Sequence, residues 1–417
     1  MRKVIFGLLI SVLVISIAFS GAGCKAAAVE ETAAVTEATA APETTVAPET
    51  TVAEETTAVE TAEEIAPFIL EARDGLEPYR SDLTFQGELG QTPTWDTEVV
   101  LTVSEVENIK EGKFTAVFNP NGFQADHTNV MIKAINDAFR EMGMELIAVT
   151  DSQNDPAKQI SDIETMLALN PDVVITGPID PVSSAEVYRK VIDSGAKLVI
   201  WSNVPQGFEH GKDYVGVVTA NAQGLAQFCV SVLADNISPD AEVGMMFFDI
   251  TFWIVNLIDS IVEDTINNDY PDLKLVAKAG YTDPYKAIEV ASGMILQNPN
   301  IEGIYGGWNL AAMGAADACK ENNRPDIKIT CFGVDMPTMI EILDGGNIVG
   351  TVSDNPYHLG FNLALLAGYG VLDKPAPEYT IVPSVPITID NFQEAWELTT
   401  NTALPDEVLQ KLMEKGM

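Results

Sequence analysis

Basic residues are scarce in this chain of 417 residues, in which 23 Lys and Arg stand against 61 Asp and Glu for a formal net charge of -38. Nucleic-acid-binding proteins need basic patches that meet phosphate groups, so the composition argues against a nucleic-acid partner. Ten of the glutamates lie in residues 25–64 beside a single lysine, so most of the acidity belongs to the rest of the chain. Beyond residue 64 only five arginines occur, at Arg73, Arg80, Arg140, Arg189 and Arg324.

Histidine and cysteine are also rare, and their spacing predicts neither a catalytic set nor a metal site. The three histidines, His127, His210 and His358, lie in separate segments without a triad signature. The four cysteines form no CxxC pair and no zinc-ligand spacing, and the chain has no GxGxxG or Walker loop. We therefore expect no enzyme activity, no cofactor and no metal. A disulfide between Cys319 and Cys331 stays open, because sequence alone does not give their geometry.

The first 24 residues have the layout of a secretory signal peptide. A basic pair at residues 2–3 precedes an apolar run at residues 4–19, and small residues then lead to Cys24. The apolar run is shorter than a membrane-spanning helix requires. The stretch resembles a bacterial lipobox, with Gly21 where that motif usually has leucine. This resemblance implies a lipoprotein, lipidated at Cys24 and held on a membrane outside the cytoplasm, at the cell surface or in the periplasm. An ordinary signal peptide is the alternative.

Two segments separate this signal from the regular part of the chain. Residues 25–64 consist almost entirely of Ala, Thr, Val, Pro and Glu, with a near-repeat in residues 41–52 (APETTVAPETTV). Such a segment has too little to bury, so we expect a disordered tether. Residues 65–112 carry Pro, Gly and Asp between short apolar pieces. We expect an irregular N-terminal extension there, packed on the body, with one short helix at residues 104–110.

From residue 114 the chain alternates short apolar strands with amphipathic helices. Strand-like runs recur at intervals of roughly 25 to 30 residues, the length of a βα unit. Strands that are apolar throughout, each followed by a helix, predict parallel sheets covered on both faces. About ten such units would give more strands than a single regular open sheet usually holds. We therefore predict an α/β fold with two doubly wound, Rossmann-like lobes, and a closed (β/α)8 barrel is the alternative.

The residues that follow the expected strands are the site candidates, because ligands of doubly wound sheets bind beyond the carboxyl ends of the strands. They are mainly Asn, Asp, Gln and aromatic side chains, which suit hydroxyl hydrogen bonds and stacking on C–H surfaces. Such Asp and Asn residues also serve as helix caps, and tryptophans also fill cores. The pattern favours a small polyhydroxylated ligand, with candidates at Asn121, Phe123, Gln124, Trp201, Ser202, Asn203, Asp283, Trp308, Asn309, Asp335 and Asp354.

Four segments resemble the ribose-type periplasmic binding proteins of type I. Residues 151–159 (DSQNDPAKQ) and 170–178 (NPDVVITGP) are similar to the first lobe of that family, and residues 308–315 (WNLAAMGA) and 331–335 (CFGVD) to its second lobe. The similarity extends in order from about residue 114 to residue 396. Members of the family are substrate-binding components of ABC importers for simple sugars. They close two lobes around the ligand and deliver it to a membrane permease.

The resemblance also implies three crossings of the chain between the lobes, near Ala220, Ser353 and Pro383. The two lobes, with a ligand cleft between them, would then consist of residues 113–219 with 355–382 and of residues 220–353 with 383–417.

Polar site positions of the family carry over only in part. Its aspartate at the end of a late strand matches Asp335, and its polar residue after the next strand matches Asp354. Its asparagine before the Ala-x-Gly-Ala helix is Trp308 here, with Asn309 beside it.

Both arginines with which the family binds sugars are missing. Ser202 and Asn203 replace an Asp-Arg pair, and Asn256 is the polar residue nearest to the position of the second arginine. Carboxylates without a guanidinium partner would repel an anion. We therefore predict a neutral simple sugar or polyol, with a cationic amine or a nucleoside as the alternative. The expected partner is an ABC permease, the expected state is a monomer, and a sensor that presents ligand to a receptor is the alternative to transport.

Overall fold

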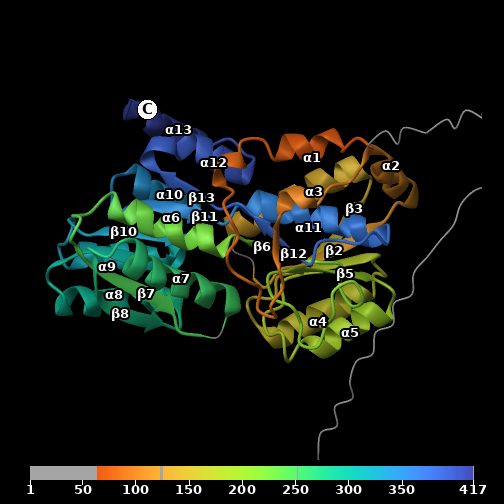
Figure 1. Ribbon diagram of the computed structural model, residues 1–417, viewed down its shortest axis with the longest axis horizontal. Coiled ribbons are helices and arrows are strands. Elements are labelled where there is room, and N and C mark those ends of the chain that lie inside the picture. Colours follow the sequence, from red (N-terminus) through yellow and green to blue (C-terminus); the bar gives the residue numbers. More distant parts are fainter. Residues whose placement is uncertain (1–62, 123–124, 251, 417) are drawn as a thin grey trace, which may run out of the picture. The chain divides into compact units, whose positions relative to one another are not determined.

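The computed structural model describes residues 63–122, 125–250 and 252–416, which form two α/β lobes (Figure 1). The expected signal peptide, its Cys24 and nearly all of the expected tether lie outside these residues. Among the described helices, none combines the length and the apolar character that a membrane span requires.

A seven-stranded sheet forms the first lobe, and every strand pair in it is parallel. Most of its strands are buried on both faces, which is why their sequences are continuously apolar rather than alternating. In spatial order the strands are β1 (Pro93–Trp95), β12 (Tyr379–Val382), β6 (Val217–Ala220), β5 (Lys197–Trp201), β4 (Val173–Thr176), β2 (Thr115–Asn119) and β3 (Glu145–Val149).

Helices cover both faces of this first sheet. One face packs against α2 (Val103–Gly112), α3 (Ala125–Met142) and α11 (Pro356–Val371). The other face packs against α4 (Pro156–Leu167) and α5 (Ala185–Asp193). The sheet is therefore doubly wound, as predicted.

A six-stranded sheet forms the second lobe, and only its edge strand β13 is antiparallel to its neighbour. Two open sheets are present in the described chain, so the prediction of two lobes is confirmed and the barrel alternative is wrong. In spatial order the strands are β13 (Val385–Thr388), β11 (Ile348–Ser353), β10 (Lys328–Phe332), β9 (Ile301–Trp308), β7 (Glu242–Phe248) and β8 (Lys274–Tyr281).

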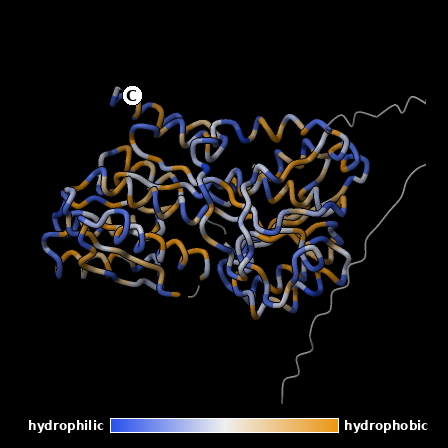
Figure 2. The backbone as a smooth tube through the Cα atoms, in the orientation of Figure 1, coloured by the Kyte–Doolittle hydropathy of each residue, from blue (hydrophilic) through white to orange (hydrophobic). Residues whose placement is uncertain are grey.

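Helices also cover both faces of the second sheet, and the hydrophobic stretches of the chain concentrate in the interior of each lobe (Figure 2). One face packs against α6 (Ala222–Ala234) and α7 (Trp253–Asp269). The opposite face packs against α8 (Ala287–Gln297), α9 (Asn309–Glu321), α10 (Met336–Leu343), α12 (Phe392–Thr400) and α13 (Asp406–Glu414).

The chain crosses between the lobes three times, after β6, after β11 and between β12 and β13. Hydrogen bonds tie the crossing segments to one another. The Asn355 side chain donates to the Pro383 carbonyl at 3.2 Å, and the Ser384 hydroxyl donates to the Asn221 carbonyl at 3.1 Å. The three crossings therefore form one hydrogen-bonded hinge.

The N-terminal segment of residues 63–112 is more regular than predicted. It contains α1 (Pro67–Ala72), two short 3-10 helices (Glu77–Tyr79 and Asp96–Glu98), the edge strand β1 and the helix α2. It also contacts both lobes, because β1 pairs with β12 of the first lobe while Leu76 is buried in the core of the second. The expected short helix at residues 104–110 lies within α2, which a capping box of Thr102 and Glu105 begins.

Candidate functional site

Two rings and a carboxylate meet where the first lobe faces the hinge. Trp201, the last residue of β5, stacks on His127 of α3, with ring centroids 5.8 Å apart and planes inclined by 22°. His127 Nε2 lies 2.8 Å from Oδ2 of Asp354, the residue after β11. Gly177 makes room for the indole, since a Cβ there would lie 2.8 Å from the Trp201 ring. We call Trp201, His127 and Asp354 the junction cluster.

Two buried acceptor oxygens at or near this cluster have no hydrogen-bond partner among the described residues. One is Asp354 Oδ1, and the other is Oδ1 of Asn203, whose amide nitrogen donates to the Pro178 carbonyl at 3.0 Å. The neighbouring Ser202 hydroxyl is 3.1 Å from the Thr219 hydroxyl. An acceptor left unpaired in a buried position costs about 1–3 kcal/mol, so both oxygens suit a ligand that donates hydrogen bonds.

An aromatic cluster lies at the strand ends of the second lobe. Trp308, the last residue of β9, is half-buried, with its centroid 5.1 Å from that of Phe248 and 6.3 Å from those of Phe252 and Phe332. Such tilted and edge-on arrangements are the favourable geometries for aromatic pairs. We call Trp308, Phe248, Phe252 and Phe332 the second-lobe ring cluster.

Backbone geometry at Gly307 sets the position of Trp308. Gly307 has φ +72°, and a Cβ there would lie 2.6 Å from the Tyr281 hydroxyl oxygen. That hydroxyl accepts a hydrogen bond from the Trp308 backbone N–H at 3.3 Å. Burial raises the pKa of the Tyr281 phenol, so the group stays neutral. A glycine at this position is therefore required both by conformation and by space.

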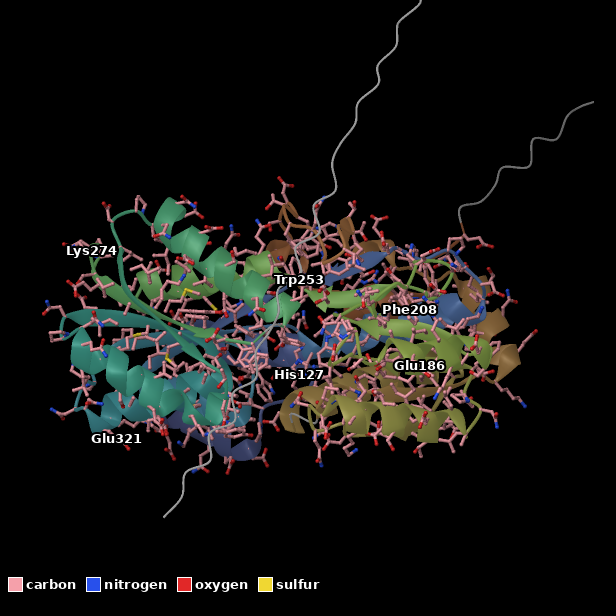
Figure 3. All side chains as sticks on the ribbon, turned by 90° about the horizontal axis from the view of Figure 1, so that it is seen from below. His127, Glu186, Phe208, Trp253, Lys274 and Glu321 are labelled. Atoms are coloured by element: carbon pink, nitrogen blue, oxygen red, sulfur yellow. The ribbon has the colours of Figure 1, made fainter. Side chains whose placement is uncertain are left out.

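Trp253, the first residue of α7, places one more polar group near the junction of the lobes. Its indole N–H is buried, and it interacts with the Tyr379 side chain. Figure 3 shows Trp253 and His127 in the region where the two lobes meet. The junction therefore holds a buried donor as well as unpartnered acceptors, which suits hydroxyl groups because they both donate and accept.

Two aspartates meet at the N-terminus of α10. Asp335 is the N-cap, and its Oδ1 accepts from the Thr338 backbone N–H at 2.9 Å. Asp126, in the first turn of α3 in the other lobe, accepts from the Met336 N–H at 3.0 Å. Free N–H groups and the helix dipole favour carboxylates at this end. The second contact is a direct hydrogen bond between the lobes.

Two predicted site residues serve local structure. The Asn256 side chain accepts from the Phe252 N–H at 2.9 Å and donates to the Phe248 carbonyl at 3.1 Å, so it holds the loop after β7. Asp283 accepts from the Tyr285 N–H at 3.0 Å and caps the 3-10 helix Pro284–Lys286. It follows β8, the edge strand at the opposite side of the sheet from β11 and Asp354.

The remaining candidates lie in loops at the strand ends. Asn121 accepts from the Gly122 N–H at 2.9 Å, and Asn309 begins α9 next to Gly333. Phe123 and Gln124 lie outside the described residues.

A buried amide network behind the first-lobe loops was not among the predicted site residues. Asn119 ends β2 and donates to Thr150 at 2.7 Å and to Ser152 at 2.9 Å. Its oxygen accepts from Gln159 at 3.0 Å, and Gln159 also donates to the Gly177 carbonyl at 2.9 Å. This network holds together the loops after β2, β3 and β4. The one feature of the sequence that indicated this network was an asparagine at the end of an apolar strand.

His127 and Asp126 also join the site from outside the predicted set. Both residues follow the first strand of the first lobe in the sequence, and the side chain of His127 is 10 % exposed. No local pattern indicated that they would meet Asp354 and Met336, which are 227 and 210 residues away in the chain.

All five described arginines form ion pairs away from these clusters. Arg73 and Arg80 pair with Asp96. The other three pair in the same way, as Arg140 with Asp137, Arg189 with Asp213 and Arg324 with Asp326. None of these residues belongs to the junction cluster or to the second-lobe ring cluster, so the carboxylates there lack a guanidinium in the described chain.

A buried acid underlies the second-lobe ring cluster. Asp259 of α7 accepts from the Phe248 N–H and from the Tyr305 hydroxyl, each at 3.0 Å. Burial raises the pKa of Asp259 to about 6. In the second lobe Cys229, Cys319 and Cys331 are buried and free, so the disulfide that the sequence left open is not formed.

Comparison with known proteins places this arrangement in a family. The chain is 22% identical over 298 residues to the ABC transporter periplasmic-binding protein YphF of Escherichia coli, covering 66% of this chain and 85% of the relative. It is 24% identical over 263 residues to the ribose import binding protein RbsB of Bacillus subtilis, covering 62% and 81%. The arabinose binding protein AraP of Geobacillus stearothermophilus superposes with a TM-score of 0.62 at 17% identity, covering 68% of this chain and 99% of that one. A model of the periplasmic binding protein domain matches residues 114–369, more than half of the chain. The protein therefore belongs to the periplasmic binding protein domain family.

Proposed function

We propose that this protein is the extracytoplasmic solute-binding component of an ABC importer, and that it binds a neutral simple sugar or polyol where its two lobes meet. Family membership and relatives named for ribose import and arabinose binding support this role. In the proposed mechanism the lobes close around the ligand at the three-stranded hinge, and the closed form delivers it to a permease.

One observation carries the choice of ligand. Rings from both lobes lie at the strand ends together with two unpartnered buried acceptors, Asp354 Oδ1 and Asn203 Oδ1, and no arginine is near them in the described chain. Sugar hydroxyls donate to such acceptors, and sugar C–H faces stack on indoles. An anion would instead meet carboxylates of like charge.

The proposed ligand contacts divide between the lobes. We assign Asn256 and Asp283 to the shaping of loops rather than to direct contact. Both the oxygen and the nitrogen of the Asn256 amide bond to loop backbone, and Asp283 caps a 3-10 helix that follows the far edge strand β8. The proposed contacts are Asn121, Phe123, Gln124, His127, Trp201, Ser202 and Asn203 in the first lobe and Trp308, Asn309, Asp335 and Asp354 in the second lobe and hinge.

We also propose that the protein is a lipoprotein held at the membrane through Cys24, with residues 25–64 as the tether. The basic, apolar and small-residue order of residues 2–23 supports this proposal. Cys24→Ala is expected to abolish metabolic labelling with radioactive palmitate and to release the protein from the membrane fraction. Labelling that persists in the variant would contradict it.

A thermal-shift screen of the protein from Lys25 onward tests the ligand assignment. The panel holds pentoses, hexoses, polyols, nucleosides and small amines. A ligand that binds only the folded state raises the melting temperature. A rise with one neutral sugar or polyol is the expected result. A rise with amines or nucleosides alone would keep the solute-binding role but overturn the sugar assignment.

A further inference from the structure

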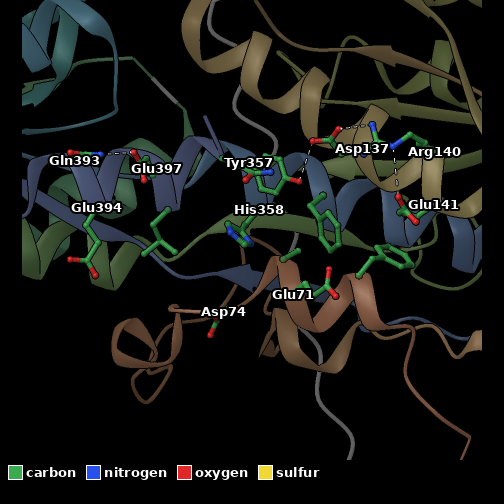
Figure 4. A pocket seen from close by; sticks show the side chains of 15 residues that line it. Glu71, Asp74, Asp137, Arg140, Glu141, Tyr357, His358, Gln393, Glu394 and Glu397 are labelled. Atoms are coloured by element: carbon green, nitrogen blue, oxygen red, sulfur yellow. Dashed lines mark hydrogen bonds and ion pairs between the residues drawn. The ribbon is translucent and has the colours of Figure 1, made fainter. Parts of the chain in front are cut away.

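A pocket with a volume of about 770 Å³ lies on the described part of the protein, and no residue of the junction cluster lines it. Its walls come from α1 and α3, from the first turns of α11, and from α12 of the second lobe (Figure 4). Two of these helices, α1 and α12, lie outside the matched family domain of residues 114–369. None of the lining residues is among the proposed ligand contacts, so the pocket is distinct from the ligand site proposed above.

Negative charge dominates the lining. Among the described residues, Arg140 is the only lysine or arginine that lines the pocket, and it pairs with Asp137 at 3.0 Å and Glu141 at 3.7 Å. No other lining carboxylate has an ion-pair partner in the described chain, although Glu397 accepts a hydrogen bond from Gln393. The six lining carboxylates are Glu71, Asp74, Asp137, Glu141, Glu394 and Glu397.

Apolar rings lie between these carboxylates. Phe68 of α1 meets Phe361 of α11 edge-on, with centroids 6.0 Å apart, and Tyr357 stacks on Phe361 at 6.2 Å. The Tyr357 ring already has the Lys133 ammonium group 4.9 Å from its centroid. Ring faces attract ammonium groups and also pack against methylene groups.

A buried histidine supplies an independent observation that points to a ligand. His358 lines the pocket, is 1% exposed, and its Nδ1 has no hydrogen-bond partner among the described residues. Burial and then the charges of Arg73 and Arg80 lower the pKa of His358 to about 3, against the opposing effect of a hydrogen bond to the Leu398 backbone. The ring is therefore neutral. A neutral imidazole has one donor and one acceptor nitrogen, and in the tautomer that carries its proton on Nε2 the acceptor is Nδ1, which an N–H donor can satisfy.

We propose that this pocket binds a linear polyamine, an unbranched chain of methylene groups that carries two or more ammonium groups. The ammonium groups donate to the carboxylates of α1 and α12 and to His358 Nδ1, and the methylene groups pack on Phe68 and Phe361. No group of three or more His, Cys, Asp and Glu side chains in the described chain is close enough to hold a metal ion. Charges spread over the pocket in this way match a cation whose charge is also spread along its length.

Isothermal titration calorimetry with spermidine at about 0.15 M salt, where exposed charges are screened, tests the proposal. The wild type from Lys25 onward is expected to bind one spermidine. The double variant Glu71→Gln, Glu394→Gln is expected to bind spermidine about tenfold more weakly, because it loses two exposed ion pairs with the ligand. Both glutamates are exposed and lack ion-pair partners in the described chain, so the variant keeps its fold, which circular dichroism checks.

The matched control separates a built site from general attraction to an acidic protein. Glu186→Gln, Glu321→Gln changes the net charge by the same amount at two exposed positions, one on each lobe (Figure 3). Unchanged spermidine affinity in the control supports the proposal. Equal weakening in both double variants, displacement of spermidine by an equal concentration of Mg²⁺, or no saturable binding by the wild type would each overturn it. Because no sugar enters the assay, these outcomes are independent of the proposed transport function.

Discussion

Asp354 uses one carboxylate oxygen in the structure and leaves the other without a partner. Oδ2 bonds to His127, which stacks on Trp201, so a single side chain links the hinge to the ring of the first lobe. Oδ1 is buried and unpaired among the described residues. At the residue scale, this oxygen is the strongest candidate for a hydroxyl contact.

The variant Asp354→Asn tests that assignment. It keeps the shape but removes the charge, so we expect ligand affinity to fall about tenfold or more, the loss of a hydrogen bond to a charged group. Titration calorimetry with the ligand found in the screen measures it. Asp344→Asn, which removes an exposed pair with Lys411, is the matched control. Wild-type affinity in Asp354→Asn would remove this residue from the site.

The raised pKa of Asp259 leads us to expect that the stability of the folded protein depends on pH. Burial raises its pKa in the folded protein to about 6 from an ordinary 3.8, so the folded state binds the proton more tightly than the unfolded state. The contribution of Asp259 to the free energy of unfolding is therefore fully present below about pH 4. It falls by about 3 kcal/mol as the pH rises through about 6. The neutral variant Asp259→Asn should lose this dependence. Urea unfolding of both proteins from pH 4 to pH 7 measures the difference, and parallel pH profiles would contradict the assignment.

At the element scale, the N-terminal segment of residues 63–112 joins the two lobes. Its strand β1 extends the first sheet, Leu76 enters the core of the second lobe, and Thr84 bonds to Gln223 of α6 at 2.8 Å. A buried carboxylate, Asp96, holds the segment together by pairing with Arg73 and Arg80. A segment fixed at both ends in this way adds contacts that the matched family domain does not contain.

Removing that buried carboxylate should weaken the whole protein. Asp96→Ala leaves two buried guanidinium groups without their shared partner, so we expect the free energy of unfolding to fall by about 3–5 kcal/mol. Glu77→Ala removes an 81% exposed partner of Arg80 and should cost at most about 1 kcal/mol. Urea unfolding compares the two variants. Equal costs would show that burial of the Asp96 pair does not matter.

At the scale of the whole molecule, the lobes already contact one another directly. The bond from the Met336 N–H to Asp126 joins α10 of the second lobe to α3 of the first, and it lies on the same side as the strand ends. A contact of this kind exists only when the lobes are close. We therefore expect it to stabilise the closed form that binds ligand.

Removing this contact between the lobes should weaken ligand binding, although Asp126 is not a proposed ligand contact. Asp126→Ala is expected to lower affinity about fivefold, the equivalent of one hydrogen bond of ~1 kcal/mol. Small-angle X-ray scattering of residues 63–417 should show a smaller radius of gyration with ligand for the wild type, and the variant should need more ligand for the same change. Identical titration curves would exclude Asp126 from closure.

The sequence predicted the fold more fully than the site. Two doubly wound lobes followed from the repeated strand and helix pattern, and the structure confirms them. The sequence did not predict β1. This strand is only three residues long, and it pairs with residues 379–381, so the sequence around it contains no pattern that specifies a strand. Among the predicted site residues, Asn256 and Asp283 follow strands like the others, and nothing in the sequence showed that the Asn256 amide would bond to loop backbone through both its oxygen and its nitrogen, or that Asp283 would lie after the far edge strand.

By itself the sequence determined the elements, the polar and aromatic character of the strand ends and the scarcity of arginine, because these are properties of residue type and local period. Tertiary structure alone decided which strand ends meet. His127 and Asp354, 227 residues apart, become neighbours only when the chain has crossed the hinge and returned. The same holds for the pocket between α1 and α12. A periodic pattern specifies which face of an element is buried, but the partner of that face is chosen by the packing of the whole chain.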